Sequence, residues 1–337
     1  MNLPPPPRHQ RAGGPHDHRK SILTGLALIG LTALRVTPSR AGDAVELPYN
    51  PPVGSHWIID TETATDDQRP DGPRTSDIKT RAEMTVEAKT ADGFHISYVS
   101  RGATFEGNAP MLPIMRQSFK ALENVTIHAT TDLSGKPVRV DNLDEAKTAM
   151  RNMVDGMMAP FKDKPQVADV MKQMLSRMIE VDASEAATIY LEELPALARA
   201  QATGMKPGEV RHSTDSAQNP LGGGLLKSNS AFTLTQADAA SGKRVYERTT
   251  AYDDSSLKEM TQTVTKKLLT AAGDAGKAEQ IEKLVKSMAL SLDERTTFEV
   301  EGGMTRRVSE KTVTMASAMG HQITKTETKT ITVTSAP

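Results

Sequence analysis

Apolar and polar residues alternate along several stretches of this sequence, and this period of two constrains the fold more than any other feature. In the stretch 77–90, Ala82, Met84, Val86 and Ala88 fall on one side. Because successive side chains of a strand point to opposite faces, such a stretch predicts a strand with one buried face. The first third of the chain is therefore predicted to be an antiparallel meander, with strands over 55–63, 77–90, 94–100 and 124–132, a polar loop over 64–76, and a turn at 91–93.

The same alternation returns in the last third of the chain. Residues 230–252 predict a hairpin whose turn is centred on Ser241-Gly242, and residues 293–334 predict further strands with turns at Gly302-Gly303 and Met319-Gly320. In the last of these strands, alternate threonines from Thr324 onward define one face. The other face combines apolar and charged residues, namely Lys325, Glu327, Lys329, Ile331 and Val333.

Between these regions, from Leu143 to about Ala202, the period changes from 2 towards 3.6, which predicts helices. The first begins at Asn142 as N-cap, with acidic residues in its first turn. A second spans about 164–181, and a third begins with Ser184 as cap, is kinked or broken at Pro195 and ends before Gly204. A further helix pair is predicted over Ser255–Ala272 and Lys277–Ser291.

The order of strands and helices predicts an α+β fold, in which a curved antiparallel sheet, half-barrel-like, carries helical insertions packed on one face. We expect one domain over 55–335. An internal similarity places an "SGK" turn between two strands, followed by a helix, at Gly135 and again at Gly242. Either two related halves, 55–203 and 204–335, descend from a duplication, or two hairpins share the same turn chemistry.

The N-terminal residues have the pattern of a signal peptide. Four basic residues precede the uncharged run Ser21–Leu34, and Ser39 and Ala41 are small residues at the −3 and −1 positions of a cleavage site. Fourteen residues span about 21 Å as a helix, short of a hydrocarbon core of roughly 30 Å. We therefore predict that residues 1–41 are cleaved near Ala41, that no membrane span remains, and that the mature protein, which starts with a proline-rich segment over 42–54, is periplasmic or secreted.

Charge and composition exclude several functions. Removal of residues 1–41 takes away six basic residues and one acidic residue, so the net charge changes from −1 to −6. Such a chain lacks the basic footprint of nucleic-acid binding. The absence of cysteine excludes disulfides, zinc–thiolate sites, cysteine nucleophiles and an acylated lipobox. No cofactor is predicted.

Methionines occur at helical spacing in two neighbouring segments, which makes them the candidate ligand-facing residues. Three interpretations apply: a thioether site for Cu(I), a flexible lining for an apolar ligand, or the core-facing side of two amphipathic helices. Copper is disfavoured because positions i and i+7 are about 10 Å apart along a helix, and we predict no metal. The residues concerned are Met150, Met153, Met157, Met171, Met174 and Met178.

Other motifs that carry chemistry are incomplete. Ser255 and Lys258 have the spacing of a serine nucleophile and lysine base, but the accompanying motifs are absent and a polar helix start is expected. Gly222–Gly224 lacks the spacing of a phosphate loop, and the pairs Asp66-Asp67 and Asp253-Asp254 are expected in solvated loops. The histidines are isolated in sequence, so a metal or catalytic site would need them to converge in the fold: His56, His95, His128, His212 and His321.

The stretch "PYNPPVGSHWIIDTET", followed by the meander and the helices, resembles exported proteins of Gram-negative bacteria with a half-barrel architecture similar to that of the lipoprotein carrier. The resemblance implies a concave apolar surface for a lipid or acyl chain and no particular site residues. We thus expect an exported, non-catalytic protein that binds a lipid, another apolar ligand or an envelope protein. The alternatives are a hydrolase assembled from distant loops and a structural envelope-interaction protein.

Overall fold

A computed structural model describes residues 47–163, 175–176, 178–201, 203–218, 225–259, 262–263, 289–318 and 321–336. The expected signal peptide, most of the second expected helix, Gly222–Gly224 and the turn at Met319-Gly320 lie outside these residues, as does most of the expected helix pair. The described residues belong to one compact unit. Whether the two halves descend from a duplication stays a prediction.

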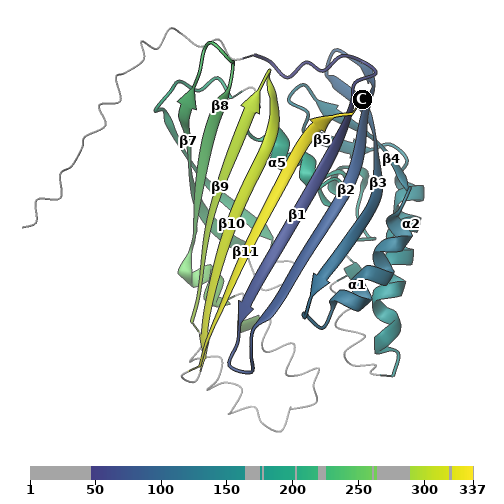
Figure 1. Ribbon diagram of the computed structural model, residues 1–337, viewed down its shortest axis with the longest axis vertical. Helices are drawn as coiled ribbons and strands as arrows, with labels where there is room; N and C mark the ends of the chain where they lie inside the picture. Colours follow the sequence, from purple (N-terminus) through teal and green to yellow (C-terminus); the bar gives the residue numbers. More distant parts are fainter. Residues whose placement is uncertain are drawn as a thin grey trace, which may run out of the picture. The chain divides into compact units, whose positions relative to one another are not determined.

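The described residues form one antiparallel sheet in the order β5-β4-β3-β2-β1-β11-β10-β9-β8-β7-β6, shown in Figure 1. β1 pairs with β11, which joins the first and last strands, and β5 and β6 are the two edges of the open sheet that the described residues form. The strands are β1 (His56–Gln68), β2 (Arg74–Lys89), β3 (Gly93–Gly107), β4 (Thr126–Asp132), β5 (Pro137–Val140), β6 (Val210–Gln218), β7 (Leu225–Ala237), β8 (Arg244–Tyr252), β9 (Ala289–Glu301), β10 (Met304–Ala318) and β11 (His321–Ser335).

The predicted meander is confirmed, but the strands are longer than the alternation indicated. β1 continues to Gln68, so the predicted loop over 64–76 is wrong except at its centre, and β9 starts at Ala289 where the second helix of the predicted pair was expected to end. Thr65 pairs with both Ser76 and Glu327. The ends of these strands have polar residues on both faces, so their sequences show no alternation. They are nevertheless strands, because their backbones are hydrogen-bonded to a strand on each side.

Helices are short and form a minor part of the described structure, so the sheet dominates more than the sequence indicated. They are α1 (Leu112–Phe119), η1 (Lys120–Leu122), α2 (Leu143–Met158), η2 (Ala159–Phe161), α4 (Ala183–Tyr190) and α5 (Glu193–Ala198). Figure 1 shows α1 and α2 beside β3 and β4, and α5 behind the middle of the sheet.

Two expected helix caps differ in detail. Asn142 is the N-cap of α2, but its side-chain oxygen accepts from the backbone N–H of His128 at 2.8 Å, which binds the helix start to β4 instead of capping the helix. The third helix is capped by Asp182 and not by Ser184. The carboxylate of Asp182 accepts from the N–H groups of Ser184 and Glu185, in a capping box with Glu185. The helix breaks before Pro195, between α4 and α5.

One face of the sheet, here called the inner face, is buried beneath the helices. Ile59, Phe94, Phe298, Val308 and Ile331 on this face are almost inaccessible to solvent and belong to one hydrophobic core with residues of α2, α4 and α5. Burial of such a side chain contributes roughly 1.5–3 kcal/mol. The last strand confirms the predicted division of faces, because Ile331 and Val333 are buried between partly exposed threonines.

The end of the proline-rich segment crosses three turns at one end of the sheet. The ring of Tyr49 packs edge-on against Phe94, with ring centroids 5.4 Å apart. Gly135, Gly242 and Gly303 all have positive φ angles in these turns. A Cβ at Gly135 would lie 2.8 Å from the Tyr49 ring, and one at Gly303 would lie 2.5 Å from the carbonyl oxygen of Pro48. The two "SGK" turns, at Gly135 and Gly242, thus both lie next to the end of the proline-rich segment.

Gly302 and Gly303 provide a matched test of this contact. Gly302→Ala should destabilise the fold by about 1 kcal/mol, the usual cost of a left-handed conformation in a residue with a Cβ. Gly303→Ala should cost about 2–4 kcal/mol, because its Cβ also clashes with backbone that must move. Urea unfolding measures both. Equal losses for the two variants would show that the segment does not rest on the turn.

Candidate functional site

A cavity of about 320 Å³ lies between the inner face and the helices on the β1–β3 side of the sheet. Its floor comes from alternate residues of the three strands, among them Thr61, Thr80, Ala82 and Tyr98. The helical side is largely apolar and consists of Phe119, Leu122, Met150, Met153, Met178, Ile189 and Tyr190. The volume is at the lower end of the range of small-molecule sites, about 300–1,000 Å³.

The cavity brings together three of the six predicted methionines. Met150 and Met153 of α2 are 6% and 5% exposed and belong to the core, and their side chains also line the cavity beside Met178. Met157 packs partly buried against the same core. Met171 and Met174 lie outside the described residues. Core packing and cavity lining are therefore combined in Met150 and Met153, and contact of these side chains with a ligand stays a prediction.

One end of the cavity is polar, which the sequence analysis did not predict. The hydroxyl of Tyr98 donates to the carboxylate of Glu193 at 3.1 Å. Burial raises the pKa of Glu193, and the neighbouring Glu192 raises it further. Burial likewise raises the pKa of Tyr98 well above its usual value. Lys329 of β11 forms an ion pair with Glu192 at 2.8 Å. The site therefore offers an apolar volume with a protonatable acid at its end.

Strand register explains how polar groups reach this face. One transverse row, defined by paired residues of β8 to β11, is apolar: Tyr246, Phe298, Val308 and Ile331. Two residues further along each strand, the row becomes Arg248, Thr296, Glu310 and Lys329. Side chains two residues apart point to the same face, so the inner face changes from apolar to charged over one step of the pleat.

Charged groups in and beside the second row compensate one another. Arg248 contacts Glu294 at 3.2 Å, and Tyr252 donates to Glu294 at 2.9 Å. Burial raises the pKa of Glu310, assisted by the nearby Glu294. The signal for this row was present in the last strand, where Lys329 shares a face with Ile331. The order of the strands, which the sequence does not specify, decided which partners it meets.

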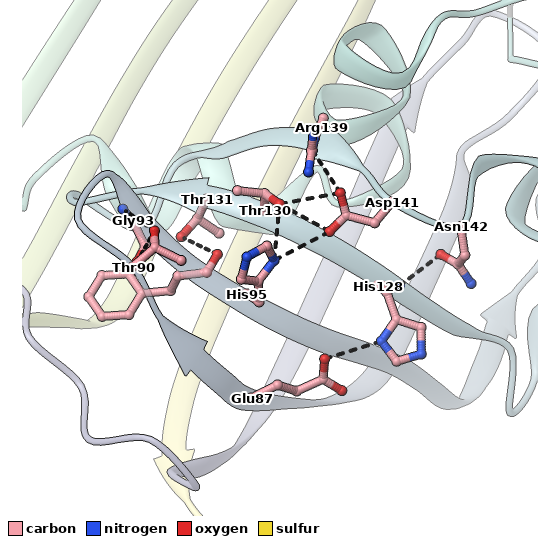
Figure 2. A network of polar contacts seen from close by, with 11 residues as sticks. Glu87, Thr90, Gly93, His95, His128, Thr130, Thr131, Arg139, Asp141 and Asn142 are labelled. Atoms are coloured by element: carbon pink, nitrogen blue, oxygen red, sulfur yellow. Dashed lines mark hydrogen bonds and ion pairs between the residues drawn. The ribbon is translucent and has the colours of Figure 1, made fainter.

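Two of the histidines lie on neighbouring strands of the outer face, as Figure 2 shows, but they do not form a catalytic centre. His128 contacts Glu87 at 3.3 Å. The Nδ1 atom of His95 is 3.2 Å from the hydroxyl of Thr130 and 3.6 Å from Asp141. A catalytic triad places nucleophile and acid on opposite ring nitrogens. Here both approach the same nitrogen, so His95 cannot relay a proton between them.

The remaining motifs have structural explanations. Ser255 donates to Asp253, whose carboxylate also accepts from the backbone of Ser256, as expected at a polar helix start. Asp66 and Asp67 lie in β1 and not in the predicted loop. Within the described ranges, no group of three or more His, Asp or Glu residues has the arrangement of a metal site. Those ranges also contain no helix long and apolar enough to cross a membrane.

The sequence matches no protein-family model and no curated protein. Similar solved structures include lipovitellin, described for its lipid–protein interactions, at 7% identity over 85% of this chain and 26% of that chain, with a TM-score of 0.40. The protein DynF of dynemicin biosynthesis in Micromonospora chersina is 7% identical over 86% of both chains, with a TM-score of 0.20. An outer membrane channel from Pseudomonas putida F1 is 7% identical over 87% of this chain and 98% of that chain, with a TM-score of 0.17. Similarities at these scores support no functional conclusion.

The raised pKa of Glu193 predicts that the stability of the fold depends on pH. The folded state raises the pKa of this acid, so the folded chain binds more protons than the unfolded chain between the two pKa values. Stability should therefore fall as pH rises from about 4.3, the usual value for Glu, through the folded-state pKa. Glu193→Gln removes this loss and still accepts from Tyr98, so the variant should be more stable than the parent at neutral pH.

Urea unfolding at pH 4 to 8 measures this difference. Glu301→Gln, at an exposed position at the end of β9, serves as the control and should leave the pH profile of the parent unchanged. A Glu193→Gln variant whose stability follows the parent at every pH would show that Glu193 does not titrate in this range.

Proposed function

We propose that this protein is an exported, non-catalytic binding protein that holds the apolar part of a lipid or related amphiphile in the cavity between its inner face and helices. The observation that supports this most is the convergence of Met150, Met153 and Met178 on that cavity. Methionine side chains are flexible and polarizable, and they adapt to apolar ligands of varied shape. Aromatic and aliphatic residues complete the lining.

The polar end of the cavity determines the kind of ligand that fits. Glu193 and Tyr98 form a hydrogen-bonded pair there, and Lys329 and Glu192 an ion pair. A ligand without polar atoms would bury part of these groups without replacing their contacts with water, which is costly. An amphiphile whose hydroxyl or amide group is placed at this end would keep them hydrogen-bonded. The proposal is therefore for a ligand with an apolar chain and a polar end.

Ile189 offers a direct test of the cavity as a binding site. It lines the cavity but is 37% exposed, so Ile189→Glu should change stability little. A carboxylate at this rim must lose solvent when an apolar ligand enters. The affinity for N-phenyl-1-naphthylamine, a neutral apolar fluorophore, should fall about tenfold or more, a loss of at least 1.4 kcal/mol.

Leu133→Glu is the matched control. Leu133 is an exposed aliphatic residue of the same size as Ile189, but it lies in the turn after β4, away from the cavity. It should bind the fluorophore as the parent does. Native mass spectrometry of the purified parent should in addition reveal co-purified lipid. Equal affinities of the two variants, together with a ligand-free parent spectrum, would exclude the proposed site.

Export belongs to the same proposal and rests on the signal-peptide pattern of residues 1–41. Expression of the full chain in a Gram-negative bacterium should yield mature protein in the periplasm or medium. Its N-terminal sequence should begin at Gly42, after Ala41. Recovery of the uncleaved chain from the cytosol would contradict this part of the proposal and leave the binding test unaffected.

A further inference from the structure

A second cavity, of about 580 Å³, lies on the inner face at the other side of the sheet, over β6, β7 and β8. Arg199, which follows α5, lines it together with Arg211 of β6 and Arg248 of β8. Asp215 is the acidic residue of the lining. The three arginines come from three separate segments of the chain, so their convergence results from the tertiary fold.

Two of these arginines are already neutralised. Arg248 contacts Glu294 at 3.2 Å and Asp215 at 3.4 Å, and it donates to Ser230 at 2.8 Å. Arg211 contacts Glu209 at 2.7 Å and donates to a backbone carbonyl oxygen. Their guanidinium groups are held in place, and their charges are balanced by these carboxylates.

Arg199 differs from both, because it forms no ion pair or hydrogen bond with any residue in the described part of the chain. Partial desolvation and the nearby Arg248 cation lower the pKa of Arg199. Arginine remains protonated at neutral pH despite such a shift. Glu294, Asp215 and Glu310 act on Arg199 electrostatically in the opposite direction, but none of them forms an ion pair with it. The guanidinium donors of Arg199 are therefore not used by any described residue.

A hydroxyl donor accompanies this cation. Ser228 of β7 lines the same cavity and is 7% exposed, and its hydroxyl makes no hydrogen bond to a described residue. This hydroxyl is not among the fully buried atoms that lack a partner, so it is accessible from the cavity and can donate to a bound group. A free guanidinium and a free hydroxyl on one cavity are complementary to an oxyanion, which accepts from both.

We propose that this cavity binds an oxyanion, a carboxylate or phosphate group, through Arg199 and Ser228, beside the fixed guanidinium groups of Arg248 and Arg211. The anion is either free in solution or the headgroup of an amphiphile. This site is distinct from the methionine-lined cavity on the β1–β3 side and does not require a ligand there.

Chain-matched probes test the proposal: decanoate, decyl phosphate and uncharged decanol, with inorganic phosphate as the free anion. Isothermal titration at constant ionic strength should show the parent protein binding at least one oxyanion probe. Arg199→Gln and Ser228→Ala should each weaken that binding about tenfold or more, as expected for hydrogen bonds to a charged group. Arg139→Gln is the control, since Arg139 pairs with Asp141 at 2.8 Å and lines neither cavity.

The outcomes separate the two sources of the anion. Binding of inorganic phosphate as well as the decyl probes identifies a free-anion site, and binding of the charged decyl probes alone identifies a headgroup site. Failure of the parent to bind any oxyanion probe, or equal binding by the parent and Arg199→Gln, would overturn the proposal. Binding of decanol reports on the methionine-lined cavity and is expected to be unaffected by Arg199→Gln.

Discussion

The pairing of β1 with β11 is the interaction on which the rest of the structure depends. It joins residues such as Ile59 and Val333, which are far apart in the sequence, in one antiparallel register. A shift of this register by one residue would turn the whole apolar set of a strand to the other face. Because the pairing holds, the inner-face residues of β1 to β5 and of β6 to β11 form one continuous surface, and one hydrophobic core serves both.

That continuous surface has an abrupt change of polarity. The row containing Phe298 and Ile331 is buried, and the next row contains Glu310 and Lys329. A sheet with only a packing role has no need for ionisable groups on its covered face, since each must be desolvated or paired. Both proposed sites lie where apolar and polar lining meet, so the surface suits ligands with an apolar part and a charged or polar part.

Much of the fold was predictable because each strand carries its own pattern. The alternation of Ala82, Met84 and Val86 was enough to define a strand and its buried face, and the start of α2 at Asn142 was visible from the cap and the following acids. The polar ends of strands were not predictable. Thr65 is held by pairing with β2 and β11, and nothing local distinguishes it from a loop residue.

The sequence by itself determined most of the strands with their buried faces, the absence of thiol chemistry, and the methionines at helical spacing, because these follow from local period and composition. Only the tertiary structure decided which side chains meet. Met178 lines one cavity with Met150 and Met153, and Arg199 lines another with Ser228, because segments far apart in the sequence pack over the same sheet. Contacts between distant segments depend on strand order and register, which no local pattern encodes.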